Sequence, residues 1–506
     1  MSQRSQDTVP TSRHAPARAE ANRWAVLALL GVAQLMVVLD ATIVNVALPS
    51  AQRSLHFSTD SRQWIITAYA LAFGSLLLLG GKLGDLFGRK WTFIAGLAGF
   101  SIASAIGGLA QSFGMLVAAR ALQGAFGALL APSALSLLTV TFAGAPDRPK
   151  AFGIFSAIAA SGASIGLLLG GVLTQALSWR WSLYVNLVIA IPTALVALRL
   201  LVNQAQPQRP RLDLPGVLLG SGALFGVVYG FSNAATHSWS ATLTIVALAA
   251  SVLLGVAFIV TERRVANPLV PTHILWDRAR GGAYASVLLA FSAAFSVFLF
   301  LTFYLQQSLG FSPLQTGVAF LPMTAMIATT ATLVQTRVLY RTGAKPLVLF
   351  GMSLGIVGML LLTRLSPSSS YAGDVLPSLI LLGVGMGSVF APSIGTATLG
   401  VPTNEAGIAS ALLNTSQQVG GSVGTALLST MFASAAASFT ASHAHLASVA
   451  NAASIHGEAT AFSWSAGIFA LGLLVAALVL PPGRLGRASR QRLSPVKGAT
   501  TSPQGA

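Results

Sequence analysis

Long apolar runs recur along almost the whole chain, and they limit its fold more than any other feature. Between Trp24 and Pro481 the 506-residue sequence passes repeatedly through apolar runs of about 20 residues, the length at which a helix crosses a bilayer. Only 8% of the residues are charged, against about 25% in soluble domains. Buried helices of a soluble enzyme would need polar faces between the runs, and these are mostly absent. The sequence therefore predicts an all-α polytopic membrane protein.

The apolar runs predict about fourteen transmembrane helices. The expected limits are 24–48, 61–81, 92–110, 113–141, 151–174, 182–203, 214–233, 241–261, 282–306, 315–336, 346–365, 375–399, 407–434 and 460–481. An even number of spans places both ends of the chain on one side of the membrane.

Positive charge alternates between the loops. The net charge is +17, and its Lys and Arg residues gather before the first expected span, in every second loop and after the last span. The intervening loops hold only Arg53, Arg62, Arg180 and Arg364. Because cytoplasmic loops carry the excess of positive residues, we expect both termini in the cytoplasm and the protein in the cytoplasmic membrane. The basicity is thus a topology signal, and we expect no nucleic-acid partner.

The sequence lacks the residues that several kinds of chemistry require. The chain has no cysteine, so disulfides and cysteine-based metal or redox centres are excluded. It has no nucleotide-binding G-x-x-x-x-G-K-[ST] loop and no nucleophile elbow with suitable partners. The seven histidines fall in expected tails or loops. We therefore expect no enzyme activity, no metal site and no cofactor.

A weak internal repeat divides the chain into halves. The segment Gly127–Ser133 shares its Gly-to-Pro-Ser spacing with Gly387–Ser393, and the turn 336–345 resembles the turn 81–90, with Gly343 on Gly88 and Lys345 on Lys90. Two parallel six-helix halves are a plan of secondary transporters, with the substrate between the halves. The expected domains are a basic tail 1–23, a half 24–203, a linker 204–280 with two extra helices, a half 281–481 and a tail 482–506.

The turn LGGKLGDLFGRK, from Leu79 to Lys90, joins two expected spans. Its glycines allow a sharp turn and close helix approach, and its charges are unusual beside apolar spans. The glycines and charged residues that matter for this turn are Gly81, Lys82, Asp85, Gly88, Arg89 and Lys90.

Charge deep inside a span is the best pointer to function in a membrane protein. By the expected limits, Asp40 is the only acidic residue deep in a span, and Arg120 is the only comparable basic residue. At 1.5 Å per residue both reach a similar depth, so they could pair. Two interpretations stay open: a proton-coupling pair that lines a cavity, or a structural ion pair.

Several motifs resemble the major facilitator superfamily and, within it, the fourteen-helix drug:proton antiporters. They include the turn above, LDATIVNVALP from Leu39, RALQGAFG from Arg120, WIITAY from Trp64, the Trp179-Arg180-Trp181 segment with Asn186, and SPLQTGVAFLP from Ser312. The resemblance covers nearly all of 24–481. It implies a role for Arg120 in proton movement. It also implies that the turn 79–90 controls the inward/outward change, which makes its six residues named above the candidate gating residues.

One motif departs from the family pattern. The fifth expected helix carries Gly162, Gly166, Gly170 and Gly171, but Leu167 stands where the family has proline. These glycines are candidates for close helix packing. The candidate cavity residues are Asn45, Trp64, Tyr69, Gln123, Asn414 and Gln418, although Asn414 and Gln418 could equally hydrogen-bond between helices.

Together with this resemblance, the sequence predicts a monomeric, proton-coupled exporter of lipophilic drugs or antibiotics that works by alternating access, with a proton gradient as its energy source. Its partners would be a small lipophilic substrate, protons and the lipid bilayer. Export of an endogenous lipid or natural product is the first alternative, and a non-transporting membrane receptor is the second.

Overall fold

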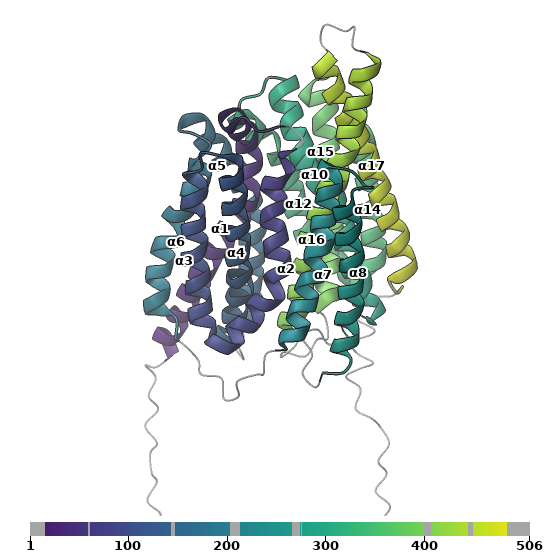
Figure 1. Ribbon diagram of the computed structural model, residues 1–506. Coiled ribbons are helices and arrows are strands. Elements are labelled where there is room, and N and C mark those ends of the chain that lie inside the picture. Colours follow the sequence, from purple (N-terminus) through teal and green to yellow (C-terminus); the bar gives the residue numbers. More distant parts are fainter. Residues whose placement is uncertain are drawn as a thin grey trace, which may run out of the picture.

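The computed structural model describes residues 16–58, 61–142, 147–202, 213–265, 274, 276–398, 406–443 and 449–482. Within these residues the fold is all helical, with no strand (Figure 1). The first six helices are α1 (Pro16–Leu55), α2 (Gln63–Phe87), α3 (Arg89–Gly108), α4 (Phe113–Thr141), α5 (Arg148–Ala176) and α6 (Trp181–Leu200). Next come α7 (Leu214–Thr236) and α8 (Thr242–Glu262).

The remaining helices form the second part of the chain. They are α10 (Arg278–Phe303) with η2 (Tyr304–Ser308), α11 (Pro313–Ala319), α12 (Leu321–Leu333), η3 (Val334–Val338), α13 (Leu339–Thr342), α14 (Ala344–Leu362), η4 (Tyr371–Val375), α15 (Leu376–Thr398), α16 (Ala406–Ser442) and α17 (Val449–Val479).

Twelve helices among the described residues are long and apolar enough to span a membrane. The helices α2 and α5 are 25 and 29 residues long, but their described apolar segments, 63–77 and 165–176, are shorter. The predicted all-helical, polytopic fold is therefore confirmed, and the predicted count of about fourteen is supported only approximately.

Local sequence sets several helix ends. Gly88 has a φ of 91°, which an L side chain rarely adopts, and it separates α2 from α3. Gly343 has a φ of 86° and separates α13 from α14 in the same way. Ser112 caps α4 by accepting a hydrogen bond from the Met115 N–H, and Ser312 and Gln315 form a capping box on α11.

The same packing pattern occurs twice. In the first six helices α1 packs on α5, α2 and α3 pack on α4, and α3 packs on α6. In the second set α10 packs on α16, α12 and α14 pack on α15, and α14 packs on α17. We refer to these sets as the first half, α1–α6, and the second half, α10–α17. The domain limits expected from the sequence stay predictions.

The helices α7 and α8 form a hairpin beside the seam between the halves. They pack on each other, and α7 also contacts α2 of the first half and α16 of the second (Figure 1). Ser221 on α7 fastens this contact, because its hydroxyl donates to the Ser75 carbonyl oxygen on α2 at 2.6 Å.

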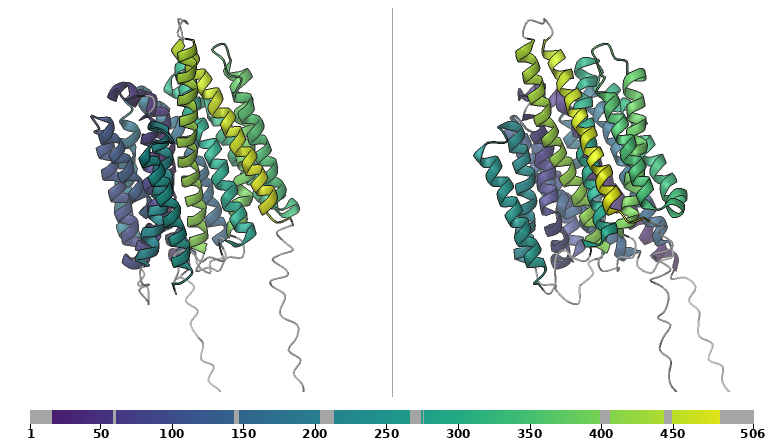
Figure 2. Two further views of the ribbon diagram at one scale, coloured as in Figure 1. Left: turned by 45° about the vertical axis from the view of Figure 1, so that its right-hand side comes forward. Right: turned by 90° about the vertical axis from the view of Figure 1, so that its right-hand side faces the viewer.

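Helices α16 and α17 project beyond the rest of the bundle at the end where α16 finishes and α17 begins (Figures 1 and 2). We call this the distal end; α1 begins and α17 finishes toward the opposite, proximal end. The expected last span, 460–481, was wrong at its start, because α17 already begins at Val449 and carries Glu458 inside the helix.

Candidate functional site

The centre of the first half holds a buried ion pair. The Arg120 Nη1 atom on α4 lies 2.6 Å from the Asp40 Oδ2 atom on α1. Asp40 is fully buried and Arg120 is 2% exposed. The structure thus brings together the two charged residues that the sequence placed at similar depth.

Three further side chains complete the site around the Asp40 carboxylate. Its Oδ1 atom accepts hydrogen bonds from Gln123 Nε2 at 3.0 Å and from Asn186 Nδ2 at 2.7 Å. The same two amide groups donate to the hydroxyl oxygen of Ser104, at 2.7 and 3.3 Å. Helices α1, α3, α4 and α6 therefore meet in one polar cluster, which we call the Asp40 cluster.

Arg120 is held by more than its carboxylate partner. Its Nη1 also donates to Gln123 Oε1 at 3.0 Å, and its Nε donates to the Ile65 carbonyl oxygen at 3.3 Å. The guanidinium lies 4.4 Å from the centre of the Tyr69 ring, within the range of a cation–π interaction. These contacts leave the guanidinium in one fixed position beside Asp40.

The contacts of the Asp40 cluster compensate a buried negative charge. A carboxylate that accepts three hydrogen bonds and one positive charge is stable when ionised, and protonation would cancel its attraction to Arg120. A cavity of about 10 Å³ lies against Arg120 on the distal side, between α1, α4 and α6, and is near the lower limit for one water molecule. Proton uptake at Asp40 would therefore change how α1 is bound to α4 and α6.

The other candidate cavity residues lie in different places. Asn45 is buried on α1, and its Nδ2 donates back to the Ala41 carbonyl oxygen at 3.3 Å. The Trp64 ring packs on Tyr229 of α7, with ring centres 6.0 Å apart. Gln418 on α16 faces Gly74 of α2 across the seam between the halves, and Asn414 lies one helical turn before it, half-buried.

The charged turn is built around close contacts between α2, α3 and α4. Gly81 and Gly84 lie against Pro132 and Ser133 of α4. Lys90 Nζ donates to the Leu198 carbonyl oxygen near the end of α6, at 2.8 Å. Lys82 is half-buried, and the side chain of Asp85 lies outside the described residues.

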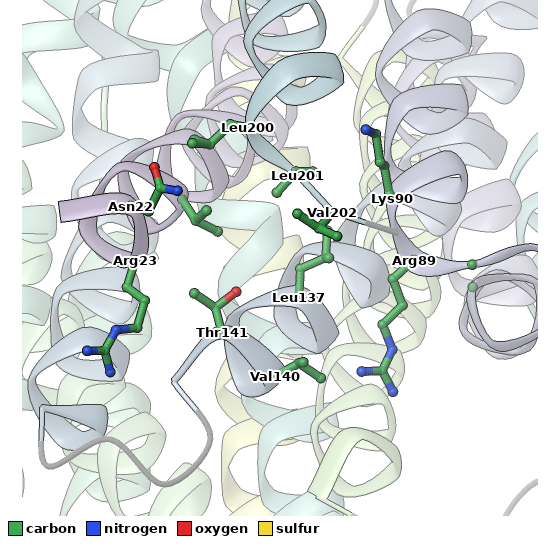
Figure 3. A pocket seen from close by; sticks show the side chains of 13 residues that line it. Asn22, Arg23, Arg89, Lys90, Leu137, Val140, Thr141, Leu200, Leu201 and Val202 are labelled. Carbon is green, nitrogen blue, oxygen red and sulfur yellow. The ribbon is translucent and has the colours of Figure 1, made fainter. Parts of the chain in front are cut away.

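Arg89 and Lys90 also line a crevice of about 430 Å³ at the proximal end of the first half (Figure 3). Arg23 of α1 borders the crevice from the other side in this view. The remaining lining comes from α1, α2, α4 and α6 together with Gly88, Leu201 and Val202. Because the crevice lies within one half, it is not the between-half position expected for a substrate.

The glycines of α5 face two neighbours. Gly162 and Gly170 lie against α1, and a β-carbon at Gly170 would sit 2.8 Å from the Ile43 carbonyl oxygen. Gly166 lies on the same face, against Leu39 and Thr42. Gly171 instead faces Leu314 on α11 of the second half. Leu167, in the position of the family proline, is fully buried, and its carbonyl oxygen lies against Gly317 of α11.

Sequence reasoning missed some buried polar residues. Ser104 and Asn186 belong to the Asp40 cluster but were not among the candidate site residues, although Asn186 lies in one of the recognised motifs. Two further acidic residues on described helices are buried, Glu262 on α8 at 4% exposed and Glu458 on α17 at 2% exposed. Arg62, assigned to a loop by its sequence, is 4% exposed.

A helical bundle of two similarly packed halves, with a buried ion pair in one of them, defines the class of polytopic secondary transporters. The family model "Major Facilitator Superfamily" matches residues 30–425. The chain belongs to this superfamily.

Similar proteins include antibiotic resistance and export proteins. The "Puromycin resistance protein pur8" of Streptomyces alboniger is 45% identical over 92% of this chain and 93% of its own length. The "Cephamycin export protein CmcT" of Amycolatopsis lactamdurans is 40% identical over 80% of this chain and 84% of its own length. The "Lincomycin resistance protein" of Streptomyces lincolnensis is 34% identical over the same shares of the two chains. The predicted similarity to drug-efflux members of the superfamily is confirmed.

Two solved structures share the fold. The human organic anion transporter MFSD10 gives a TM-score of 0.57 at 16% identity, covering 90% of this chain and 99% of that one. A bacterial homologue of the human lysosomal transporter Spinster, in an inward-facing and unoccupied conformation, gives a TM-score of 0.60 at 17% identity. The match covers 91% of this chain and 98% of that one.

Proposed function

We propose that this transporter exports small antibiotics from the cytoplasm in exchange for protons. The Asp40 cluster is the observation that carries the proposal. A buried carboxylate in a membrane protein is costly, and a site that changes charge there is well suited to proton coupling. The antibiotic resistance and export proteins among its relatives support a small-molecule substrate.

In this proposal Asp40 holds the proton and Arg120 responds to it. When Asp40 is ionised, Arg120, Gln123 and Asn186 draw α1, α4 and α6 together. When a proton neutralises Asp40, the attraction to Arg120 falls, and the balance between inward- and outward-facing states shifts. The charged turn around Gly88 would pass this change between α2 and α3.

We further infer that the membrane is the cytoplasmic membrane, with both termini and the proximal end in the cytoplasm. The positive residues support this orientation, because they gather at the tails and in alternate loops. The distal end would then face the outside, from which protons enter. We also propose that the working unit is a monomer.

Transport into energised inside-out vesicles tests the function. Puromycin is the first compound to measure, since a relative named for puromycin resistance is 45% identical over nearly the whole chain. We expect uptake that stops when an uncoupler removes the proton gradient, and that is absent from vesicles without the protein. Uptake that continues unchanged in the uncoupler would contradict proton coupling, and no uptake of any compound in a panel with lincomycin and cephamycins would contradict antibiotic export.

A further inference from the structure

The crevice at the proximal end of the first half combines a cationic and an apolar lining. Arg23 of α1 borders it opposite Arg89, and Lys90 follows on the Arg89 side (Figure 3). The apolar lining consists of Val26, Leu137, Val140, Leu200, Leu201 and Val202. Among the residues that the structure describes, no acidic side chain lines the crevice. An amphiphile with a negative head group would therefore complement both parts of the lining.

Arg23 is the cation of this crevice that is free to bind a ligand. It is half-buried, and it makes no hydrogen bond or ion pair with any other described residue. The other two cations are engaged, because Lys90 Nζ donates to the Leu198 carbonyl oxygen and Arg89 also interacts within the protein. The guanidinium groups of Arg23 and Arg89 both extend downward in Figure 3, on opposite sides of the crevice. Arg23 thus supplies the hydrogen-bond donors, and the other two cations add positive charge.

The second half closes the corresponding place with a protein contact. Arg278, at the start of α10, donates to the Leu478 carbonyl oxygen near the end of α17, at 3.1 Å. In the repeated packing pattern α10 and α17 correspond to α1 and α6. In the first half the start of α1 and the end of α6 line the crevice instead, and no described contact of Arg23 joins them. A ligand on Arg23 would supply the connection that Arg278 makes in the second half.

Exposed apolar side chains place the crevice at the level of lipid head groups. Trp91, directly after Lys90, is 51% exposed, and Val202 in the crevice lining is 77% exposed. Lys90 Nζ lies 5.6 Å from the centre of the Trp91 ring. Tryptophan and basic residues at the end of a membrane helix are typical of the membrane–water interface, and basic pockets between such helices bind anionic head groups. A ligand with acyl chains could therefore stay in the bilayer while its head group reaches Arg23.

We propose that this crevice binds an anionic phospholipid, with its phosphate group on Arg23 and its hydrocarbon against the apolar lining. The phosphate oxygens accept hydrogen bonds from the Arg23 guanidinium, next to the positive charges of Arg89 and Lys90. The bound lipid joins the start of α1 to the turn 79–90 and to the end of α6. This site involves neither the antibiotic nor the proton, so it goes beyond the proposed function.

Binding of a fluorescent phosphatidylglycerol to the full-length protein in neutral detergent tests the site. Three unlabelled competitors separate its requirements: phosphatidylglycerol, phosphatidylcholine with the same acyl chains, and glycerol 1-phosphate, which has the phosphate but no chains. We expect phosphatidylglycerol to displace the probe at a concentration about tenfold lower than phosphatidylcholine, because hydrogen bonds between charged partners are the stronger ones. Glycerol 1-phosphate should displace much less, because it has no chains to pack on the apolar lining.

Two variants and a matched control locate the binding. Arg23→Gln should weaken it about tenfold, since the charged hydrogen bonds to the phosphate are lost. Arg199→Gln removes a charge from the last turn of α6, which is exposed and outside the crevice lining, and should change binding by less than about twofold. Val140→Trp should also weaken binding, because it fills the crevice without changing the charge.

Thermal unfolding in detergent checks that the variants fold. Without lipid, Arg23→Gln should unfold at the parent midpoint, since no described hydrogen bond or ion pair is lost. Added phosphatidylglycerol should raise the midpoint of the parent protein more than that of Arg23→Gln, because a ligand stabilises the folded state that binds it. Equal rises in the two proteins would contradict binding at Arg23.

Three results of the binding measurement would overturn the proposal. Equal affinities of Arg23→Gln and Arg199→Gln would reduce the binding to a diffuse effect of surface charge. Equal displacement by phosphatidylcholine would remove the requirement for an anionic head group. Equal displacement by glycerol 1-phosphate would assign the crevice to a soluble phosphate ester instead of a lipid. The measurement uses no antibiotic and no proton gradient, so the lipid site and the proposed function stand or fail separately.

Discussion

Lys90 and Lys345 make the same hydrogen bond in the two halves of the molecule. Lys90 Nζ donates to the Leu198 carbonyl oxygen near the end of α6, at 2.8 Å. Lys345 Nζ donates to the Ala477 carbonyl oxygen near the end of α17, at 2.6 Å. Each lysine stands two residues after a glycine with a φ near 90°, Gly88 or Gly343. The weak sequence repeat thus corresponds to a repeated hydrogen bond, which joins α3 to α6 in the first half and α14 to α17 in the second.

Loss of either lysine bond should lower stability modestly. A positive charge near the carbonyls that end a helix stabilises it by about 1 kcal/mol. We expect Lys90→Met and Lys345→Met each to lower the thermal unfolding midpoint in detergent by a few degrees. Lys82→Met, in the same charged turn, is the control and should change the midpoint less. Midpoints equal to the control in both variants would show that the bonds do not stabilise the bundle.

The Asp40–Arg120 pair should behave as a coupled unit. Removing one charge leaves the other buried without a partner, at a cost of about 3–5 kcal/mol. We expect Asp40→Asn and Arg120→Gln each to destabilise the protein, and the double variant to be more stable than either single variant. None of the three should support proton-driven uptake. Thermal unfolding of the four proteins measures the coupling, and strictly additive losses would argue against an energetic pair.

Tyr69 should matter for its ring rather than for its hydroxyl. The ring faces Arg120, and the buried hydroxyl has no hydrogen-bond partner among the described residues. We expect Tyr69→Phe to keep both stability and transport, because only the unpaired hydroxyl is lost. Tyr69→Leu should lower both, since the cation–π contact is lost with the ring. Equal loss in the two variants would assign the role to the hydroxyl instead.

The tight α1–α5 contact predicts that the stability of the protein depends strongly on the glycines of α5. A methyl group at Gly170 would lie 2.8 Å from the Ile43 carbonyl oxygen, so Gly170→Ala must push α5 away from α1. We expect a loss of stability of about 1–3 kcal/mol, as for other overpacked sites. Gly467→Ala on α17 is the matched control, because nothing lies within 4 Å of its β-carbon position. There the change should be neutral or stabilising, by about 1 kcal/mol at most. Similar midpoints for both variants would contradict the packing argument.

The sequence predicted the fold because its strongest signals are local. Apolar length and charge alternation identify spans one at a time, and the family motifs order them. The limits 113–141 expected for the fourth helix match α4, Phe113–Thr141. Asp40 and Arg120 could be singled out for the same reason, since each is an isolated charge in an apolar run.

The residues that were missed depend on tertiary contacts or on a weak apolar signal. Ser104 and Asn186 look like ordinary small polar residues of a span until α3 and α6 bring them to Asp40. The start of α17, VANAASIHGEA, is too rich in small and polar residues to be recognised as part of a span. For this reason Glu458 was assigned outside the last span. The burial of Arg62 could not be predicted, because only the fold shows that three phenylalanines of the second half surround it.

The central claim is that Asp40 couples drug movement to protons. Proteoliposomes separate this role from drug binding, because exchange of labelled for unlabelled puromycin needs no proton gradient, whereas accumulation does. The parent protein should perform both reactions. We predict that Asp40→Asn keeps puromycin exchange and loses accumulation driven by a pH gradient. Accumulation by Asp40→Asn at the parent rate, with exchange also intact, would contradict the account.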